Sequence, residues 1–148
     1  IWEEQKVDKR IIFETKNFLV FLPFFTDYPY GVFIVAKNDA IYFSNFSENE
    51  KKELGIILKD VLGMFDALYD KPFPYMMCVH QAPVNSEEWE NSSLYYRFHI
   101  EFYPPLRSSD AIKYYASSEM GAWAAANTRN VEETALELKI ALKKYKNA

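Results

Sequence analysis

Residues 97–105 constrain the fold most, because they combine a strict period of two with an abrupt end. Apolar and polar side chains alternate through Arg97-Phe98-His99-Ile100-Glu101-Phe102-Tyr103, and two prolines follow. This alternation predicts a β-strand over 95–103 with one apolar and one polar face. Proline has no backbone N–H to donate to a sheet, so the strand should end before Pro104. His99 and Glu101 are therefore expected on the same face.

A second strand is predicted over 75–83, and it contains His80, the only other histidine of the chain. If the two strands are antiparallel neighbours, His80, His99 and Glu101 converge on one point. Imidazole and carboxylate are common ligands of zinc and iron, so these residues form a candidate metal site. The alternative is that each histidine is a buried, hydrogen-bonded core residue. Cys78 should share a strand face with His80, and we expect it to be a core residue rather than a nucleophile.

The rest of the pattern predicts an α+β fold, in which helices pack on an antiparallel sheet. Short apolar strands are predicted over 11–13, 18–24 and 32–36, separated by turn and loop residues. Their closeness in sequence predicts an antiparallel meander. A polar loop over 84–93 should join the two strands that carry the histidines.

Two amphipathic helices are predicted. The first covers about residues 47–70: it begins with a capping box at 47–50, and apolar residues then recur every three or four positions. We expect Gly55 and Gly63 to let this helix pack closely on the sheet. The second covers about residues 131–146, which are acidic at the start and basic at the end, as the helix dipole favours.

Length and charge narrow the range of functions. The 148 residues suit one domain with an ordinary core. A net charge of −4 gives no basic surface for nucleic acid, and no apolar run reaches the ~18 residues of a membrane helix. The single cysteine allows no internal disulfide and no signal-peptide pattern opens the chain, so we expect a cytoplasmic protein. The first residue, Ile1, is not Met, which suggests a piece of a longer protein.

The motifs around the two histidines resemble one family. The segments Phe73-Pro-Tyr-Met-Met-Cys-Val-His80-Gln-Ala-Pro83 and His99-Ile-Glu101-Phe-Tyr-Pro-Pro-Leu106-Arg107-Ser108 are similar to the C-terminal half of galactose-1-phosphate uridylyltransferases, which belong to the histidine-triad (HIT-like) superfamily. The similarity extends over almost the whole chain. It implies a single HIT-like domain over residues 1–148, with the catalytic N-terminal half of a two-lobed enzyme absent.

The resemblance implies a reaction and its partners. Family members transfer UMP from UDP-glucose to galactose 1-phosphate through a uridylylated histidine, a step in galactose metabolism. That histidine lies in a His-Pro-His motif followed by Gly-Gln, which this chain lacks. No catalytic residue is therefore expected here, and the isolated chain should be inactive. The implied partners are UDP-glucose or UDP-galactose, a hexose 1-phosphate, the N-terminal half and a second subunit in a homodimer.

The resemblance also implies a metal site. His80 and His99 match ligands of a family site that usually holds iron, together with a glutamate upstream of this segment. Glu101 stands where the family has the second histidine of a His-x-His pair. A structural iron or zinc ion bound by His80, His99 and Glu101 is therefore expected.

Substrate-binding residues are expected beyond the proline pair. Lys113 and Glu119 match family residues that contact the hexose of the UDP-sugar in the partner subunit's active site. A cation can face phosphate, and a carboxylate can accept two sugar hydroxyls. Arg107 and Asn127 are further candidates, whereas Ser118 departs from the tyrosine common in the family. On residue type alone, Lys113 and Glu119 could instead be solvated charges on a short surface helix.

Two other functions stay open from sequence. One is a related phosphorylase that acts on ADP-glucose or a dinucleoside tetraphosphate, which would share the two-lobed scaffold and the histidine nucleophile but prefer adenine. The other is a HIT-like domain that binds a nucleotide sugar without catalysis.

Overall fold

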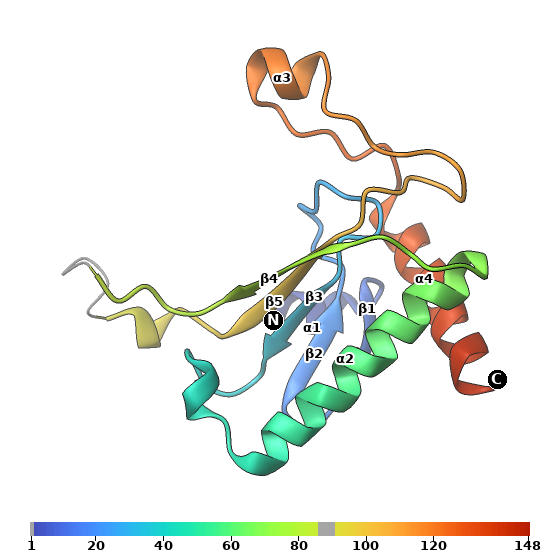
Figure 1. The fold of residues 1–148 in the computed structure, drawn as a ribbon. Helices are drawn as coiled ribbons and strands as arrows, with labels where there is room; N and C mark the ends of the chain where they lie inside the picture. The colour runs from blue at the N-terminus through green and yellow to red at the C-terminus, as the bar shows by residue number, and fades with distance from the viewer. Residues whose placement is uncertain (1, 86–90) are drawn as a thin grey trace.

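A five-stranded antiparallel sheet organises the molecule. In the computed structural model, which describes residues 2–85 and 91–148, the strand order is β1-β2-β3-β5-β4 (Figure 1). Residues 86–90 of the predicted loop lie outside the described part. The strands are β1 (Ile11–Glu14), β2 (Phe18–Phe21), β3 (Phe33–Ala36), β4 (Met76–His80) and β5 (His99–Tyr103).

The predicted meander is confirmed, because β1 pairs with β2 and β2 with β3, both antiparallel. β5 then inserts between β3 and β4. Its register with β4 places His80 opposite His99 and Cys78 opposite Glu101. Residues that oppose each other on neighbouring strands project from the same face. The two histidines and Glu101 therefore share one face, as predicted.

β5 begins at His99, four residues later than predicted. The preceding residues Ser92–Leu94 form a short 3-10 helix, η3, and the backbone N–H of Tyr96 donates to the carbonyl of Ser92 at 2.7 Å. Because these groups are satisfied locally, this segment does not join the strand ladder. β2 is also shorter than predicted and ends at Phe21, two residues before Pro23.

The predicted first long helix is confirmed as α2 (Glu48–Tyr69). Ser47 is its N-cap: the hydroxyl accepts from the N–H of Glu50 at 3.3 Å, and the Glu50 carboxylate accepts from the N–H of Ser47 at 2.8 Å. This reciprocal pair satisfies two otherwise free N–H groups. The helix ends at Tyr69, and its C-cap Asp70 adopts a left-handed conformation ahead of Pro72. The remaining helices are α1 (Trp2–Val7), η1 (Phe43–Asn45), α3 (Ser118–Ala122) and α4 (Val131–Lys146).

The predicted C-terminal helix is confirmed as α4, whose N-cap Asn130 accepts from the N–H of Glu133 at 3.1 Å. The expected role of the glycines is wrong. A Cβ on Gly63 would lie 2.3 Å from the ring of Tyr145, so this glycine allows α2 to approach α4, not the sheet. Gly55 faces open space. Among the described residues, no helix combines the length and the apolar character needed to cross a membrane.

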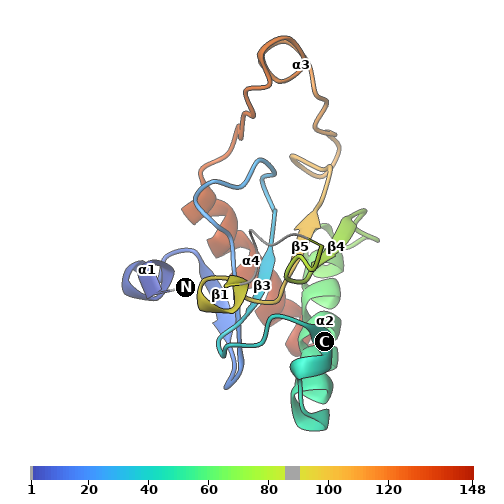
Figure 2. The same ribbon diagram turned by 90° about the vertical axis from the view of Figure 1, so that its left-hand side faces the viewer.

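Both long helices cover one face of the sheet (Figure 2). Ile100 and Phe102 of β5 point toward them and are at most 2% exposed. Phe65 of α2 stacks on Phe73 with ring centroids 5.2 Å apart, and it meets Phe102 edge-on at 5.6 Å. The polar residues of β5 are thereby directed to the opposite face of the sheet.

Residues 107–127, here called the arm, leave the end of β5 and return to α4. The arm projects beyond the sheet and carries α3 at its tip (Figures 1 and 2). A bridge between Leu106 and Ile112 closes the base of its outgoing limb. The returning limb leads to Arg129, which pairs with Glu137 of α4 at 2.5 Å. Both limbs are thus tied to the body of the domain.

Candidate functional site

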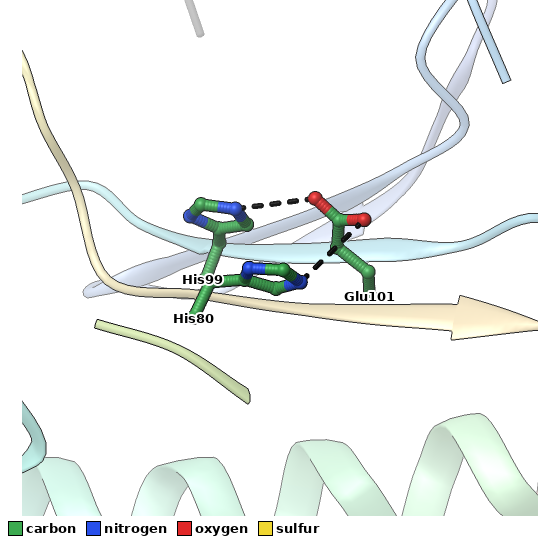
Figure 3. Close-up of side chains that lie close together, drawn as sticks. All are labelled: His80, His99 and Glu101. Atoms are coloured by element: carbon green, nitrogen blue, oxygen red, sulfur yellow. Dashed lines mark ion pairs between the residues drawn. The ribbon is translucent and has the colours of Figure 1, made fainter. Parts of the chain in front are cut away.

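Three side chains suited to metal binding meet on the sheet face opposite α2 (Figure 3). His80, His99 and Glu101 each offer a ligand atom, and these atoms lie within 4.8 Å of one another. Glu101 Oε1 is 3.2 Å from His99 Nε2, and its Oε2 is 3.7 Å from His80 Nε2. Zinc bonds to nitrogen and oxygen measure about 2.0–2.2 Å, so ligands of one ion lie within about 4.4 Å of each other. The three ligand atoms thus already lie close to the spacing that a single ion requires.

The contacts of His99 indicate which of its ring nitrogens is the donor. Its Nδ1 lies 2.8 Å from the backbone carbonyl of Arg97. A carbonyl only accepts, so Nδ1 carries a proton and donates it. In the neutral ring, Nε2 then presents a lone pair to the carboxylate of Glu101, which is also an acceptor. Two acceptors 3.2 Å apart repel each other, so a proton or a metal cation between them would stabilise the pair.

His80 supplies the second argument that the residues fit a metal ion. Its ring stacks on His99 with centroids 4.7 Å apart and planes at 4°. Its Nε2 is buried and has no hydrogen-bond partner within residues 2–85 and 91–148. A buried unpaired polar atom costs about 1–3 kcal/mol, which a metal bond would remove. The alternative of a satisfied core histidine is therefore wrong for His80, whose side chain is also 38% exposed.

Tyr103 belongs to this site, although the sequence analysis did not single it out. It follows Glu101 by two residues on β5, and its hydroxyl donates to Glu101 Oε2. Burial raises the pKa of this hydroxyl, and the bond to Glu101 raises it further, so Tyr103 stays a donor at neutral pH. The sequence could have identified Tyr103, because the period of two places His99, Glu101 and Tyr103 on one face.

Cys78 was expected in the core, and this prediction is wrong. β4 is an edge strand, and Cys78 is exposed on it. Its neighbours Met76, Met77 and Val79 are also about half exposed. Cys78 does face Glu101 across the strand pair, but it lies outside the group of converging metal ligands.

Lys113 and Glu119 lie on the arm and form an ion pair of 3.1 Å. Their side chains are only 2% and 9% exposed, so the alternative of solvated surface charges is wrong. Lys113 precedes α3, and Glu119 lies within its first turn. The backbone N–H of Ala116 lowers the pKa of Glu119, and Lys113 adds to this effect. Glu119 is therefore a carboxylate at neutral pH.

The other two predicted substrate-binding residues lie at the base of the arm. Asn127 donates to the carbonyl of Thr26 and accepts from the N–H of Arg129, each at 3.0 Å. The backbone carbonyl of Arg107 accepts a hydrogen bond from the guanidinium of Arg129 at 3.4 Å. The side-chain Nε of Arg107 is buried and has no hydrogen-bond partner among the described residues. Neither residue lines the cavities beside the arm.

Two neighbouring cavities connect the arm with the metal-ligand cluster. One, of about 320 Å³, is lined by Asp27, Tyr115, Glu119, Met120, Trp123 and Ala125. The other, of about 210 Å³, is lined by Phe25, Thr26, Asp27, Tyr28, Phe33, Glu101 and Tyr103. Asp27 borders both. The sequence analysis missed it, because nothing in the pattern of the loop at 26–31 indicated that it lies beneath the arm.

The fold places the chain in a known structural class. The structure is similar to that of a zinc-bound histidine triad family protein from Mycobacterium smegmatis, with a TM-score of 0.58, 12% identity, and coverage of 93% of this chain and 86% of that one. At 12% identity this similarity is evidence for the fold alone, and that fold is HIT-like. The expected α+β class is confirmed.

Sequence comparison identifies the family. Residues 2–146 match the model of the galactose-1-phosphate uridyl transferase C-terminal domain. A galactose-1-phosphate uridylyltransferase of Thermotoga maritima is 41% identical over 136 residues, which are 92% of this chain and 42% of that protein. A solved uridylyltransferase structure matches with a TM-score of 0.82 and 31% identity, over 95% of this chain and 43% of that one. The chain belongs to the family of galactose-1-phosphate uridyl transferase C-terminal domains.

These matches cover only part of the relatives' own length. It spans less than half the length of the Thermotoga maritima relative and of the solved uridylyltransferase. The expected family and fold are confirmed, whereas the activity belongs to longer proteins.

Proposed function

We propose that the chain is the C-terminal half of a hexose-1-phosphate uridylyltransferase, which transfers UMP from UDP-glucose to galactose 1-phosphate in galactose metabolism. The observation that carries the proposal is the family match over residues 2–146. The 41% identity to a galactose-1-phosphate uridylyltransferase supports it. The complete protein would be a cytoplasmic homodimer, and the lone cysteine suits that reducing compartment.

The nucleophile of this reaction would lie outside the chain, in an N-terminal half. A histidine nucleophile needs a partner that orients its ring and leaves one nitrogen free to attack. The chain contains only His80 and His99, and both belong to the metal-ligand cluster with Glu101. This chain would therefore contribute substrate recognition and structural support, whereas the residue that forms the covalent bond would lie outside it.

The cluster would hold a structural iron or zinc ion, bound by His80, His99 and Glu101. Two imidazoles and one carboxylate form a donor set that both metals accept. Such an ion would join β4 to β5 and neutralise the carboxylate of Glu101. The orphaned nitrogen of His80 and the acceptor pair of His99 and Glu101 support this assignment.

The arm would form the substrate-recognition element, with Lys113, Glu119, Arg107 and Asn127 as its polar residues. Glu119 lines the cavity of about 320 Å³ together with the rings of Tyr115 and Trp123. Carboxylates accept sugar hydroxyls, and aromatic rings offer apolar faces to a pyranose. This combination favours a hexose over an apolar ligand.

An assay of the complete protein tests the proposal. We expect UMP transfer from UDP-glucose to galactose 1-phosphate, and no transfer by the isolated 148-residue chain, because the nucleophile is absent. Turnover of ADP-glucose but not UDP-glucose would instead identify a phosphorylase. Binding of nucleotide sugars without turnover would identify a non-catalytic domain. UMP transfer by the isolated chain would disprove the proposal that the nucleophile lies outside it.

A further inference from the structure

One guanidinium group joins both ends of the arm to the body of the domain. Arg129 lies just beyond the returning limb, and its Nη2 pairs with Glu137 Oε1 of α4 at 2.5 Å. Its Nη1 donates to the backbone carbonyl of Arg107, where the outgoing limb begins, at 3.4 Å. A guanidinium carries five N–H donors in a rigid planar fork, so it holds two partners at a defined angle. Arg129 therefore fixes the two limbs relative to α4 at the base of the arm.

A buried tyrosine holds the carboxylate that Arg129 binds. Tyr30 is fully buried, and its hydroxyl donates to Glu137 Oε2 at 2.6 Å, while Arg129 occupies Oε1. The Tyr30 hydroxyl has one proton, so the hydroxyl of Tyr69 in α2, 2.7 Å away, is the donor in the bond between the two tyrosines. Burial raises the pKa of Tyr30, and the bond to Glu137 raises it further, so Tyr30 stays protonated at neutral pH. Both oxygens of Glu137 are thus held in place.

Tyr30 also anchors the loop against which the arm lies. This loop connects β2 to β3, and its Thr26 and Asp27 carbonyls accept hydrogen bonds from Asn127 and Lys113 of the arm. The same loop lines both cavities beside the arm. The loop and the base of the arm are therefore fastened to a single carboxylate of α4.

We propose that Arg129 and Glu137 are positioning residues for UMP transfer: their pair sets the angle at which the arm leaves the domain, and so places Lys113 and Glu119 against the hexose. Arg129 and Glu137 line neither of the two cavities beside the arm, so they act through the arm and not on the sugar itself. Because α3 lies at the tip of the arm, a small rotation at the base moves Glu119 by a larger distance (Figures 1 and 2). The inference rests on the proposed function, which gives the arm a hexose to bind.

Two UMP donors test the positioning role on the complete protein. UDP-glucose carries the hexose that the arm would hold, whereas p-nitrophenyl uridine 5′-phosphate carries no sugar beyond its ribose. In both, UMP passes to the histidine nucleophile, and glucose 1-phosphate or p-nitrophenolate leaves. In Arg129→Met, uridylylation by UDP-glucose should slow by roughly 10–100-fold, because a misplacement of about 1 Å has effects of this size. Uridylylation by the aryl ester should change little, since it loses no contact with the arm. Equal losses with the two donors would overturn the proposal.

Glu137→Gln is the milder variant of the same pair. It keeps an acceptor for Tyr30 but removes the charge that Arg129 binds, so it should also slow UDP-glucose selectively, and it keeps the test available if Arg129→Met fails to fold. Because both substitutions break one pair, the double variant should lose little more than the larger single loss. Losses that add in full would overturn the shared role. Glu133→Gln removes an exposed glutamate of α4, is the matched control, and should keep wild-type rates with both donors.

Hydrogen exchange separates failure of this inference from failure of the proposed function. In Arg129→Met, the amides of residues 107–127 should exchange at least about tenfold faster, because local opening of the arm controls their exchange. Glu133→Gln should leave this segment unchanged. If the wild-type protein accepts UMP from neither donor, the proposed function fails, while the exchange result still decides whether Arg129 holds the arm. Unchanged exchange over 107–127 in Arg129→Met would overturn that role.

Discussion

Replacing His99 by alanine is expected to strip the metal ion from the complete protein. The wild-type protein should retain about one iron or zinc ion per chain after gel filtration, measured by elemental analysis. Loss of a group that only supports a ligand costs about 10–100-fold in metal affinity, so loss of a ligand itself should cost at least about 100-fold. His80→Ala should have the same effect, because its Nε2 belongs to the same group of converging atoms.

Cys78→Ala is the matched control for these variants. Cys78 lies two residues from His80 on β4 and opposite Glu101, yet it is not one of the converging ligands. Its replacement should leave the metal content unchanged, which separates ligand loss from general disturbance of the strand. A wild-type protein without iron or zinc, whose stability His99→Ala does not alter, would contradict the metal site.

Phe65→Ala is expected to destabilise the domain by about 3–5 kcal/mol. Phe65 is fully buried where α2 meets the sheet, and its ring contacts those of Phe73 and Phe102. Truncation of a buried phenylalanine loses its transfer free energy and leaves a cavity, which together cost this amount. Since whole domains are stable by about 5–15 kcal/mol, the loss is a large share of the total. Urea unfolding of the chain, with the free energy extrapolated to water, measures it.

Phe24→Ala provides the comparison for this stability measurement. Phe24 is 69% exposed, and its ring meets only the exposed Phe25 among the described ring contacts. Surface substitutions of this kind usually change the free energy of unfolding by no more than about 0.5 kcal/mol. Similar losses in the two variants would mean that the core does not lie between α2 and the sheet.

Local signals in the sequence predicted most of the fold. The capping box at Ser47 and the apolar period of α2 placed that helix within one residue at each end. The period of two in β5 put His99 and Glu101 on one face, and the register with β4 then brought His80 to them. These features depend on residues close in sequence or on one strand pair, which is why patterning was sufficient.

Features that depend on tertiary context could not be predicted in this way. The pattern of β4 does not tell whether it is a central or an edge strand, so the exposure of Cys78 was missed. Lys113 is held by the backbone carbonyls of Asp27 and Ala126, and backbone groups leave no mark in the sequence. The burial of this charge depends on the contact between the arm and the loop at 26–28, which the sequence pattern does not encode.

The position of the covalent UMP group tests the central claim most directly. The complete protein would be incubated with UDP-glucose labelled in the α-phosphate, without galactose 1-phosphate, and the labelled peptide identified by mass spectrometry. We expect the label on a histidine outside residues 1–148, and its release when galactose 1-phosphate is added. Label on His80 or His99, or no covalent label at all, would contradict the assignment of this chain as the recognition half of a uridylyltransferase.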